Sequence, residues 1–223
     1  MPRTLEFIEA TPEAVPRLDG DSIHLWRIPY ALSQGRAPLR ALLASYLDVP
    51  VSAVALDDDA KGKPRLKPVP AGFPAGPSVP LAFNWSHSGD YALIALARDG
   101  ALGVDIERLG KNLRALEIAQ RFFDPAEAEA LAALDDAARE RAFIGLWCAK
   151  EAVLKAVGEG LSFGLARLAF APRNDLDWAL QRVDPALGRA EHWQLAGFDA
   201  APGYRGSLAW QGDMREIRAF RLP

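Results

Sequence analysis

The sequence predicts an α+β fold with largely antiparallel sheets. Its strand-like and helix-like segments follow the order strand, helix, strands, helices, strands, without the regular alternation of a parallel sheet. Asp99-Gly100, which lies between two apolar runs, is a strong signal for a two-residue hairpin. Residues 136–157 have the apolar spacing of one long amphipathic helix. Together these three observations favour mixed helices and antiparallel strands over an all-helical or doubly wound fold.

The first eighty residues predict two strands, one helix and two irregular stretches. Residues 22–28 alternate well enough between apolar and polar side chains for a strand. Residues 35–48 carry apolar side chains at spacings of three and four, and a proline follows, so they predict a helix that ends there. Residues 52–56 predict a short strand and residues 57–64 a polar turn. The proline- and glycine-rich residues 67–80 predict a surface loop.

The middle of the chain predicts an antiparallel meander. Residues 81–85 and 91–97 have strand character, and the turn-rich residues 86–90 separate them. The Asp99-Gly100 turn then leads into residues 101–107. We therefore expect these three strands to pair in order.

Helices and then strands complete the chain. Asp124-Pro125 places a capping residue before a proline at the first helical position. The long helix over residues 136–157 ends at Gly158 and Gly160. Later strands are expected at residues 166–170, 192–198, 204–210 and 216–220. The two halves of the chain thus each show a helix followed by a few strands.

Composition excludes several classes of protein. The chain has 223 residues, of which 50% are hydrophobic and 25% charged, so it is not a disordered chain. Its net charge of −3 gives no global positive field for nucleic acid or an anionic membrane. Its one cysteine, Cys148, forms neither an intramolecular disulfide nor a cysteine-based zinc site. Residues 1–20 lack the apolar run of a signal peptide, and no membrane span is visible, so we expect a cytoplasmic protein.

Two carboxylates share one face of a predicted strand. Asp105 and Glu107 stand two positions apart, whereas Val104 and Ile106 point to the opposite face. Two carboxylates about 7 Å apart along a strand repel each other unless a cation or solvent screens them. A solvated surface and a metal site are both open at this point.

A second acid and a lysine share one face of the long helix. Trp147, Glu151 and Lys155 are spaced by four residues. Glu151 and Lys155 could form an ordinary helix ion pair. Alternatively, Glu151 adds a third oxygen ligand and Lys155 a cation for phosphate, a set that suits Mg²⁺.

Two further segments carry polar or cationic groups. In residues 84–89, short polar side chains and a glycine at a strand end can present hydroxyls and amides to an anion, although His87 could be merely exposed. Residues 62–65 form a rigid turn with two cations, which is common on protein surfaces.

Taken together, these segments resemble the Sfp-type 4′-phosphopantetheinyl transferases in order and spacing. The resemblance covers roughly residues 22–165. The segments that carry it are Gly62-Lys63-Pro64, Phe83-Asn84-Trp85-Ser86-His87-Ser88, Gly103-Val104-Asp105-Ile106-Glu107, Arg121-Phe122-Phe123 and Trp147-Cys148-Ala149-Lys150-Glu151-Ala152-Val153-Leu154-Lys155. The third and last of these segments together are highly specific.

The resemblance implies a role for individual residues. Asp105, Glu107 and Glu151 look like the Mg²⁺ ligands, and Glu151 also like the base for the incoming serine. Lys155 looks like the lysine that holds the coenzyme A diphosphate, which makes Glu151 and Lys155 the expected catalytic pair. The residues that look like coenzyme A ligands are Lys63, Ser86, His87 and Lys155. Cys148 has no implied role beyond packing.

The sequence departs from the family pattern in one place. Members usually carry a longer basic stretch between the first strand and the first helix than residues 27–34 provide. Arg36 and Arg40 are the arginines placed to contact the nucleotide end instead.

The resemblance also implies a fold and a reaction. The fold is α+β with two similar halves related by a pseudo-twofold axis, each with a largely antiparallel sheet and a packed helix, and with the active site in the cleft between them. Here the coenzyme A-binding half would be residues 1–100 and the metal-binding half residues 101–223. The reaction transfers the 4′-phosphopantetheine arm from coenzyme A to a serine of an acyl- or peptidyl-carrier protein, releases 3′,5′-ADP and requires Mg²⁺. A monomer suffices for such a site.

Three alternatives remain open at the level of sequence. A coenzyme A-binding module could keep the fold without turnover. A generic Mg²⁺-dependent phosphohydrolase would explain the acids but not the Gly-Lys-Pro and Ser-His segments. Residues 108–121 have a local charge of +3, from Arg108, Lys111, Arg114, Arg121 and Glu117. This stretch is either a docking rim for an acidic carrier protein or an ordinary amphipathic helix.

Overall fold

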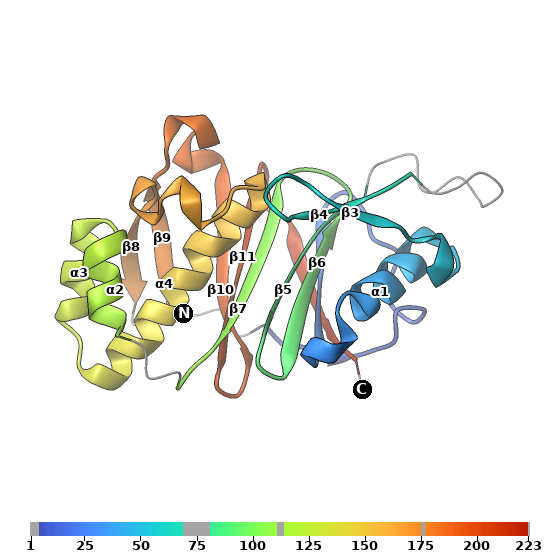
Figure 1. Ribbon diagram of the computed structural model, residues 1–223, viewed down its shortest axis with the longest axis horizontal. Coiled ribbons are helices and arrows are strands. Elements are labelled where there is room, and N and C mark those ends of the chain that lie inside the picture. Colours follow the sequence, from blue (N-terminus) through green and yellow to red (C-terminus); the bar gives the residue numbers. More distant parts are fainter. Residues whose placement is uncertain (1–4, 69–80, 111–113, 175–176, 223) are drawn as a thin grey trace.

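A computed structural model describes residues 5–68, 81–110, 114–174 and 177–222 (Figure 1). It confirms the mixed α+β class. A five-stranded sheet has the order β1 (Ile8–Glu9), β12 (Glu216–Arg221), β2 (Ser22–Pro29), β6 (Tyr91–Ala97), β5 (Ala82–Ser88). A three-stranded sheet has the order β10 (Trp193–Ala201), β11 (Tyr204–Gln211), β7 (Leu102–Arg108). Two hairpins complete the strands, β3 (Leu56–Asp58) with β4 (Pro64–Leu66), and β8 (Ala169–Asn174) with β9 (Asp177–Arg182).

Four α-helices lie in the described part of the chain: α1 (Ala37–Leu47), α2 (Ala115–Phe122), α3 (Pro125–Ala132) and α4 (Asp136–Val157). The helix predicted over residues 136–157 has these bounds because Asp135 accepts a hydrogen bond from the Ala138 amide at one end. At the other end Gly158 adopts a positive φ of 76°. Asp124 caps α3 as expected, with Pro125 in its first turn.

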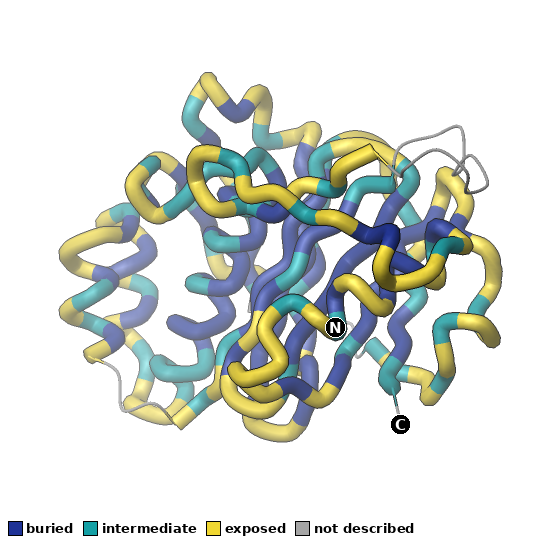
Figure 2. Tube along the Cα trace, turned by 45° about the vertical axis from the view of Figure 1, so that its right-hand side comes forward, coloured by how far each residue is buried: buried dark blue, intermediate teal, exposed yellow. Residues whose placement is uncertain are grey.

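The two sheets face each other, and a helix covers each outer side. Alternate residues of β2 and β6 pack against β7, β10 and β11 in one apolar cluster, which joins the sheets. The opposite residues of β2, β5 and β6 pack on α1, and α4 packs on the far side of the three-stranded sheet. Figure 1 shows α1 and α4 at opposite ends of this arrangement, and Figure 2 shows that the buried residues concentrate in the strands and α4.

The predicted meander is wrong at its third strand. β6 pairs with β5 and β2, whereas β7 pairs with β11, so the Asp99-Gly100 turn carries the chain out of one sheet and into the other. Both edges of β6 are already occupied, and β7 lies against α4 instead. The hairpin signal identified the turn but not the partner strand.

Other differences concern short elements. Residues 51–53 form a 3₁₀ turn and the strand begins only at Leu56, so the strand predicted over 52–56 is mostly wrong. β5 continues through Ser88, which shortens the turn expected over residues 86–90. β9 was not expected at all. Residues 69–80 of the expected surface loop lie outside the described residues.

The last strand returns to the first part of the chain. β12 lies between β1 and β2 and runs parallel to both, although most other pairs are antiparallel. The boundary expected near residue 100 falls where the chain passes between the sheets, but residues 216–221 belong to the sheet of the earlier half.

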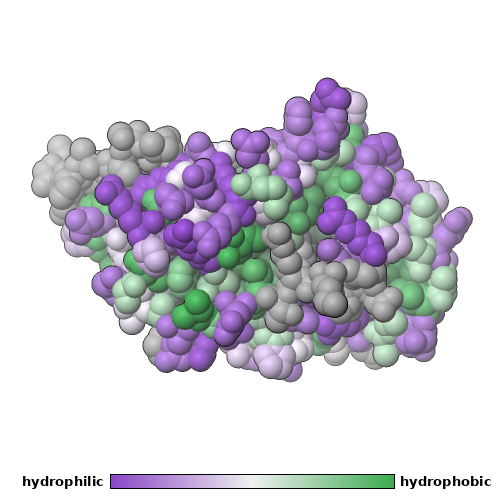
Figure 3. All heavy atoms as spheres, turned by 180° about the vertical axis from the view of Figure 1, so that it is seen from behind, coloured by the Kyte–Doolittle hydropathy of each residue, from purple (hydrophilic) through white to green (hydrophobic). Residues whose placement is uncertain are grey.

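The side opposite to the view of Figure 1 has a mixed surface. Figure 3 shows hydrophilic side chains spread over that face, with apolar residues in smaller patches between them. Within the described ranges, no helix has the length and apolar character that a membrane crossing requires.

Candidate active site

Strand β7 presents two acids to helix α4. Val104 and Ile106 are fully buried between the sheets, so the alternating residues Asp105 and Glu107 lie on the opposite face of the strand. Asp105 is itself buried, with 3% of its surface exposed, which is unusual for a carboxylate without a charged partner.

A glycine allows α4 to approach β7 closely. A Cβ at Gly103 would stand 1.9 Å from the carbonyl oxygen of Ala152 and 2.5 Å from the amide nitrogen of Ala156. No residue other than glycine fits this contact without moving the helix. The close approach brings the face of α4 that carries Glu151 and Lys155 against the acids of β7.

Lys155 is the cation that pairs with Asp105. Its Nζ lies 2.6 Å from Asp105 Oδ1 and donates to Ser86 Oγ at 2.9 Å. Ser86 Oγ in turn donates to the same Asp105 oxygen at 2.7 Å. Burial alone would lower the pKa of Lys155, but the neighbouring Asp105 carboxylate raises it above the ordinary value, so the side chain is charged.

Burial is the main influence on the Glu151 carboxyl. It raises the pKa of Glu151 to about 7; the charge of Lys155 acts in the opposite direction, and the charges of Asp105 and Glu107 add smaller increases. The three acids are therefore close enough to interact electrostatically. Among the described residues, Glu151 Oε1 and Asp105 Oδ2 are buried oxygens without a hydrogen-bond partner. Such orphaned carboxylate oxygens are costly unless a cation or donor occupies the space beside them.

These acids do not form a ready-made metal cage. In the described part of the chain, no group of three or more His, Cys, Asp or Glu side chains is arranged so that it could hold a metal ion. The orphaned oxygens and the raised pKa nonetheless fit a hard cation, which takes only oxygen ligands and keeps several waters.

Strand β5 places Ser86 and His87 on opposite sides. Ser86 is buried and faces Asp105 and Lys155. His87 is exposed, and its ring centroid lies 4.7 Å from that of Tyr30 and 5.3 Å from that of Trp85, tilted against both rings. Burial lowers the pKa of His87, and the charge of Lys155 lowers it further. The resemblance implies that Ser86 and His87 together hold a phosphate of coenzyme A; in this structure the two side chains start from opposite faces of the strand.

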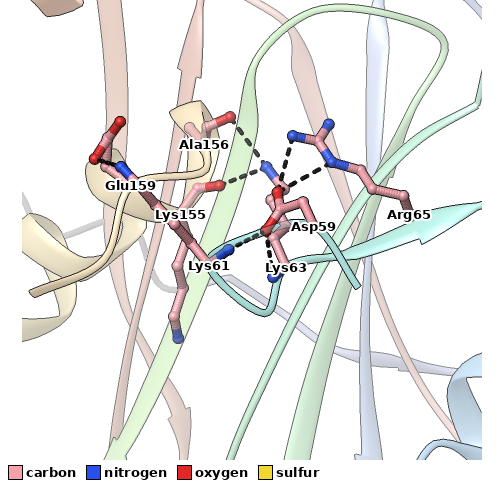
Figure 4. A network of polar contacts seen from close by, with 7 residues as sticks. All are labelled: Asp59, Lys61, Lys63, Arg65, Lys155, Ala156 and Glu159. Atoms are coloured by element: carbon pink, nitrogen blue, oxygen red, sulfur yellow. Dashed lines mark hydrogen bonds and ion pairs between the residues drawn. The ribbon is translucent and has the colours of Figure 1, made fainter. Parts of the chain in front are cut away.

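Lys63 binds the end of α4. Its Nζ donates to the carbonyl oxygens of Lys155, at 2.5 Å, and Ala156, at 3.1 Å. Figure 4 shows the carbonyls of both residues facing Lys63, while the side chain of Lys155 extends away from the turn. Burial, with a smaller contribution from Arg65, lowers the pKa of Lys63 to about 8. A lysine at the carbonyl end of a helix also interacts favourably with the helix dipole.

The rest of the β3–β4 turn supports this contact. Asp59 accepts from the amides of Lys61 and Lys63 and pairs with the Arg65 side chain at 3.2 Å, and Lys61 pairs with Glu159 beyond the helix (Figure 4). The turn thus holds both Lys63 and the residues just after α4.

The two arginines expected at the nucleotide end lie at the start of α1. Arg36 precedes the helix and pairs with Asp58 of β3 at 2.7 Å, and Arg40 is exposed one turn later. The arrangement therefore brings Asp105, Glu107, Glu151, Lys155 and Ser86 together. His87 lies on the other face of β5 within electrostatic range of Lys155, and Arg36 and Arg40 stand at the first turn of α1.

Comparison with known proteins decides what this constellation belongs to. Residues 101–209 match the family model of the 4′-phosphopantetheinyl transferase superfamily. The Synechocystis sp. protein slr0495, whose name assigns it provisionally to the 4′-phosphopantetheinyl transferases, is 36% identical over 195 residues, 84% of this chain and 75% of its own. The Nostoc sp. 4′-phosphopantetheinyl transferase HetI is 31% identical over 208 residues, 78% of this chain and 81% of its own. This chain belongs to the 4′-phosphopantetheinyl transferase superfamily.

A more distant relative shows that the similarity extends to animals. The human L-aminoadipate-semialdehyde dehydrogenase-phosphopantetheinyl transferase is 34% identical over 146 residues, 63% of this chain and 46% of its own. The chain is therefore a phosphopantetheinyl transferase, and the resemblance seen in its motifs is confirmed.

The transferase also contains polar residues to which the sequence assigned no role. Asn84 and Ser88 lie on the same face of β5 as Ser86, and Asn84 Oδ1 accepts from the Val104 amide at 2.8 Å. Ser88 Oγ donates to Glu107 Oε2 at 2.8 Å. The signal was present as the two-residue alternation of Asn84, Ser86 and Ser88, which places all three on one face of a strand.

Proposed function

We propose that this transferase moves the 4′-phosphopantetheine arm of coenzyme A to a serine of an acyl- or peptidyl-carrier protein, releases 3′,5′-ADP and depends on Mg²⁺. The observation that carries the proposal is the group on β7 and α4, where Asp105 and Glu151 contribute buried carboxylate oxygens without partners beside the charged Lys155, among the described residues. This is an arrangement suited to charge neutralisation, the main requirement of phosphoryl transfer.

Asp105, Glu107 and Glu151 are the residues that would hold the metal ion. Carboxylate oxygens are the ligands that Mg²⁺ prefers. When bound, the ion would neutralise the negative charge of the coenzyme A diphosphate. Burial raises the pKa of Glu151 to about 7, so a cation beside this carboxylate would offset the cost of keeping its charge in a buried place.

Glu151 and Lys155 are the proposed catalytic residues. The serine hydroxyl of the carrier protein attacks the β-phosphorus, a new P–O bond forms, and the bond between this phosphorus and the oxygen bridging to the α-phosphate breaks. Glu151 accepts the hydroxyl proton, directly or through water. Lys155 holds the diphosphate oxygens and stabilises the charge on the leaving 3′,5′-ADP.

Coenzyme A binding by Lys63, Ser86, His87, Arg36 and Arg40 remains part of the proposal. Ser86 and Lys63 already have partners in this structure, on Asp105 and on the carbonyls of α4. His87 is exposed beside two aromatic rings and Arg40 is exposed on α1, whereas Arg36 is partly exposed and paired with Asp58, so His87 and Arg40 have the most direct access to a phosphate or an adenine.

The architecture proposed for this reaction has two similar halves, residues 1–100 on the coenzyme A side and residues 101–223 on the metal side. Strand β12, although part of the later residues, lies in the sheet of the coenzyme A half. The place where β5 of one sheet meets β7 of the other supports an active-site cleft between the halves. All the proposed site residues come from one chain, which supports a monomer. The cytoplasmic location stays a prediction.

The carrier protein is proposed to dock beside α2. Lys111 of the basic stretch over residues 108–121 lies outside the described residues. Arg114 pairs with Glu117 on the exposed side of α2, and Phe122 keeps 47% of its surface exposed. A hollow of about 650 Å³ lies next to this helix, and both arginines (Arg114, Arg139) and acids (Glu117, Asp136, Glu140) line it. The support for an acidic helical partner is therefore the net positive charge of residues 108–121 together with the exposed Phe122, not the hollow itself.

Intact-mass measurement of an apo carrier protein tests the proposed function. With coenzyme A and Mg²⁺, the carrier should gain the mass of one phosphopantetheine group and an equal amount of 3′,5′-ADP should appear. Removal of Mg²⁺ with a chelator should stop both. Binding of coenzyme A with no mass gain on a panel of carriers would instead indicate a binding module, and phosphate release without a carrier would indicate a phosphohydrolase.

A further inference from the structure

Strands β5 and β7 are joined by side chains rather than by backbone pairing. They belong to different sheets, yet they lie side by side (Figure 1). Asn84 contacts the Val104 amide, Ser86 contacts Asp105, and Ser88 contacts Glu107. The sequence offset between partners is 20, 19 and 19 residues, so the two strands run in the same direction in a constant register.

Ser88 occupies the end of this side-chain seam and is buried, with 6% of its surface exposed. Its hydroxyl accepts a hydrogen bond from the Arg108 amide at 3.1 Å and donates to Glu107 Oε2 at 2.8 Å. A hydroxyl has one hydrogen, and the Arg108 amide already donates its own hydrogen to a lone pair of the Ser88 oxygen. The hydroxyl hydrogen is therefore directed at the Glu107 carboxylate.

We propose that Ser88 is a positioning residue that fixes the Glu107 carboxylate for cation binding, in a site whose metal role is itself part of the proposed function. Glu107 stands near the end of β7 and is only partly buried, so its side chain has more rotamer freedom than the buried Asp105. The hydrogen bond from Ser88 ties that side chain to the frame of both strands. Carboxylates that ligate metals are commonly held by such hydrogen bonds.

Ser86 has a different position in the same seam. It donates to Asp105 but also accepts from Lys155, so its removal would disturb two charged groups at once. Ser88 contacts Glu107 and the Arg108 amide without Lys155, which makes it the cleaner site for a test.

The experiment compares Ser88→Ala with Ser207→Ala. Ser207 is similarly buried on the neighbouring strand β11, directly opposite Asp105, and among the described residues its hydroxyl has no hydrogen-bond partner, so it controls for the loss of a buried hydroxyl next to the acids that does not hold a carboxylate. Two readouts are used: the Mg²⁺ concentration that half-activates transfer, and the shift in melting temperature caused by Mg²⁺ alone without coenzyme A.

Ser88→Ala should need roughly tenfold more Mg²⁺ in both readouts, the usual effect of losing a group that holds a metal ligand. The kcat at saturating Mg²⁺ should stay within about a factor of three, because the groups that contact substrate are unchanged. Ser88→Thr, which keeps the hydroxyl, should restore the wild-type Mg²⁺ dependence. If Ser88→Ala does not fold, Ser88→Cys, with its weaker donor, should show a smaller shift in the same direction.

If the wild type responds to Mg²⁺ and the two variants Ser88→Ala and Ser207→Ala depend equally on Mg²⁺, the inference is overturned. The proposed function would remain intact. A wild type that transfers phosphopantetheine without responding to Mg²⁺ in either readout would contradict the metal role of the acids, and this inference with it.

Discussion

Lys63 shows how a residue with a clear motif can have a different partner from the one that its motif implies. The Gly-Lys-Pro segment predicted a lysine for coenzyme A, whereas the structure places the amine on the last carbonyls of α4, directly behind Lys155. Carbonyls at a helix end have no partner within the helix, so a cation there satisfies them. Lys63 therefore stabilises the segment that carries the proposed catalytic lysine.

Replacing Lys63 by methionine should lower the free energy of unfolding by about 1–2 kcal/mol, the range for a partly buried cation at a helix end. The adjacent Lys61→Met is the matched control. It removes an exposed ion pair with Glu159 and should cost no more than about 0.5 kcal/mol. Chemical denaturation measures both, and equal losses in the two variants would show that Lys63 has no special role at the helix end.

His24 provides a pH-dependent contribution to stability. It is fully buried, its Nδ1 lies 2.6 Å from the Tyr46 hydroxyl, and burial lowers its pKa from 6.5 to about 4, assisted by the charge of Arg218. Between these two pKa values, the unfolded chain binds a proton at His24 more readily than the folded chain does. The contribution of His24 to stability is therefore fully present above pH 6.5 and is lost as the pH falls toward 4.

At pH 5 the contribution of His24 should be about 2 kcal/mol smaller than at pH 7.5. The His24→Asn variant, whose side chain does not titrate, should lack this decrease in the free energy of unfolding between pH 7.5 and pH 5. The His192→Asn variant, changed at an exposed position, should show the same decrease as the wild type. Denaturation curves at the two pH values decide the point. The same pH dependence in wild type and His24→Asn would rule out this histidine as the source.

At the level of elements, the contact between α4 and β7 determines the geometry of the site. Gly103 faces the backbone of α4 at Ala152 and Ala156, and the next two alternating positions of the strand are Asp105 and Glu107. Any side chain at position 103 must push the helix away from the strand. Glu151 and Lys155 would then move away from the acids.

Gly103→Ala should therefore destabilise the fold by about 3 kcal/mol, at the upper end for overpacking, and abolish most transfer activity. Gly20→Ala is the control, because nothing lies within 4 Å of the added Cβ, and its effect should be within about 0.5 kcal/mol. Thermal and denaturant unfolding measure the difference. Tolerance of alanine at position 103 would contradict the close backbone approach.

Most helices and strands were predicted from local signals, because caps and side-chain periodicity depend only on residues that are close in the sequence. The bounds of α4 follow from a cap at Asp135 and a glycine at 158, and the shared face of Asp105 and Glu107 follows from the two-residue period of a strand. The partner of β7 could not be predicted in this way. It is β11, about a hundred residues later, and no local pattern encodes that pairing.

In the candidate site too, the local sequence predicted some features, whereas others depend on residues that are distant in the sequence. The helical period placed Glu151 and Lys155 on one face, but the sequence left open whether Lys155 pairs with Glu151 or serves as a cation for phosphate. The structure pairs it with Asp105, 50 residues earlier. The contact of Ser88 with Glu107 depends on two sheets meeting edge to edge, which only the tertiary fold determines.

At the level of the whole molecule, the proposed site lies where the two sheets meet. β5 contributes the serines from one sheet, β7 the acids from the other, and α4 closes the group from outside. β12 ties the end of the chain back into the first sheet, between β1 and β2. The relative position of the sheets therefore determines the distances among the charged groups on which the proposed reaction depends.

The most direct test of the account is phosphopantetheine transfer by Glu151→Gln, followed by intact mass of an apo carrier protein with coenzyme A and Mg²⁺. The substitution keeps the shape of the side chain and removes the charge that accepts the proton and faces the cation. Transfer should fall at least a hundredfold, in the range of about 10²–10⁴ for loss of a general base, with little change in melting temperature. Glu129→Gln, at an exposed position on α3, should transfer at the wild-type rate. A Glu151→Gln enzyme as active as the Glu129→Gln control would contradict the central role of the three acids.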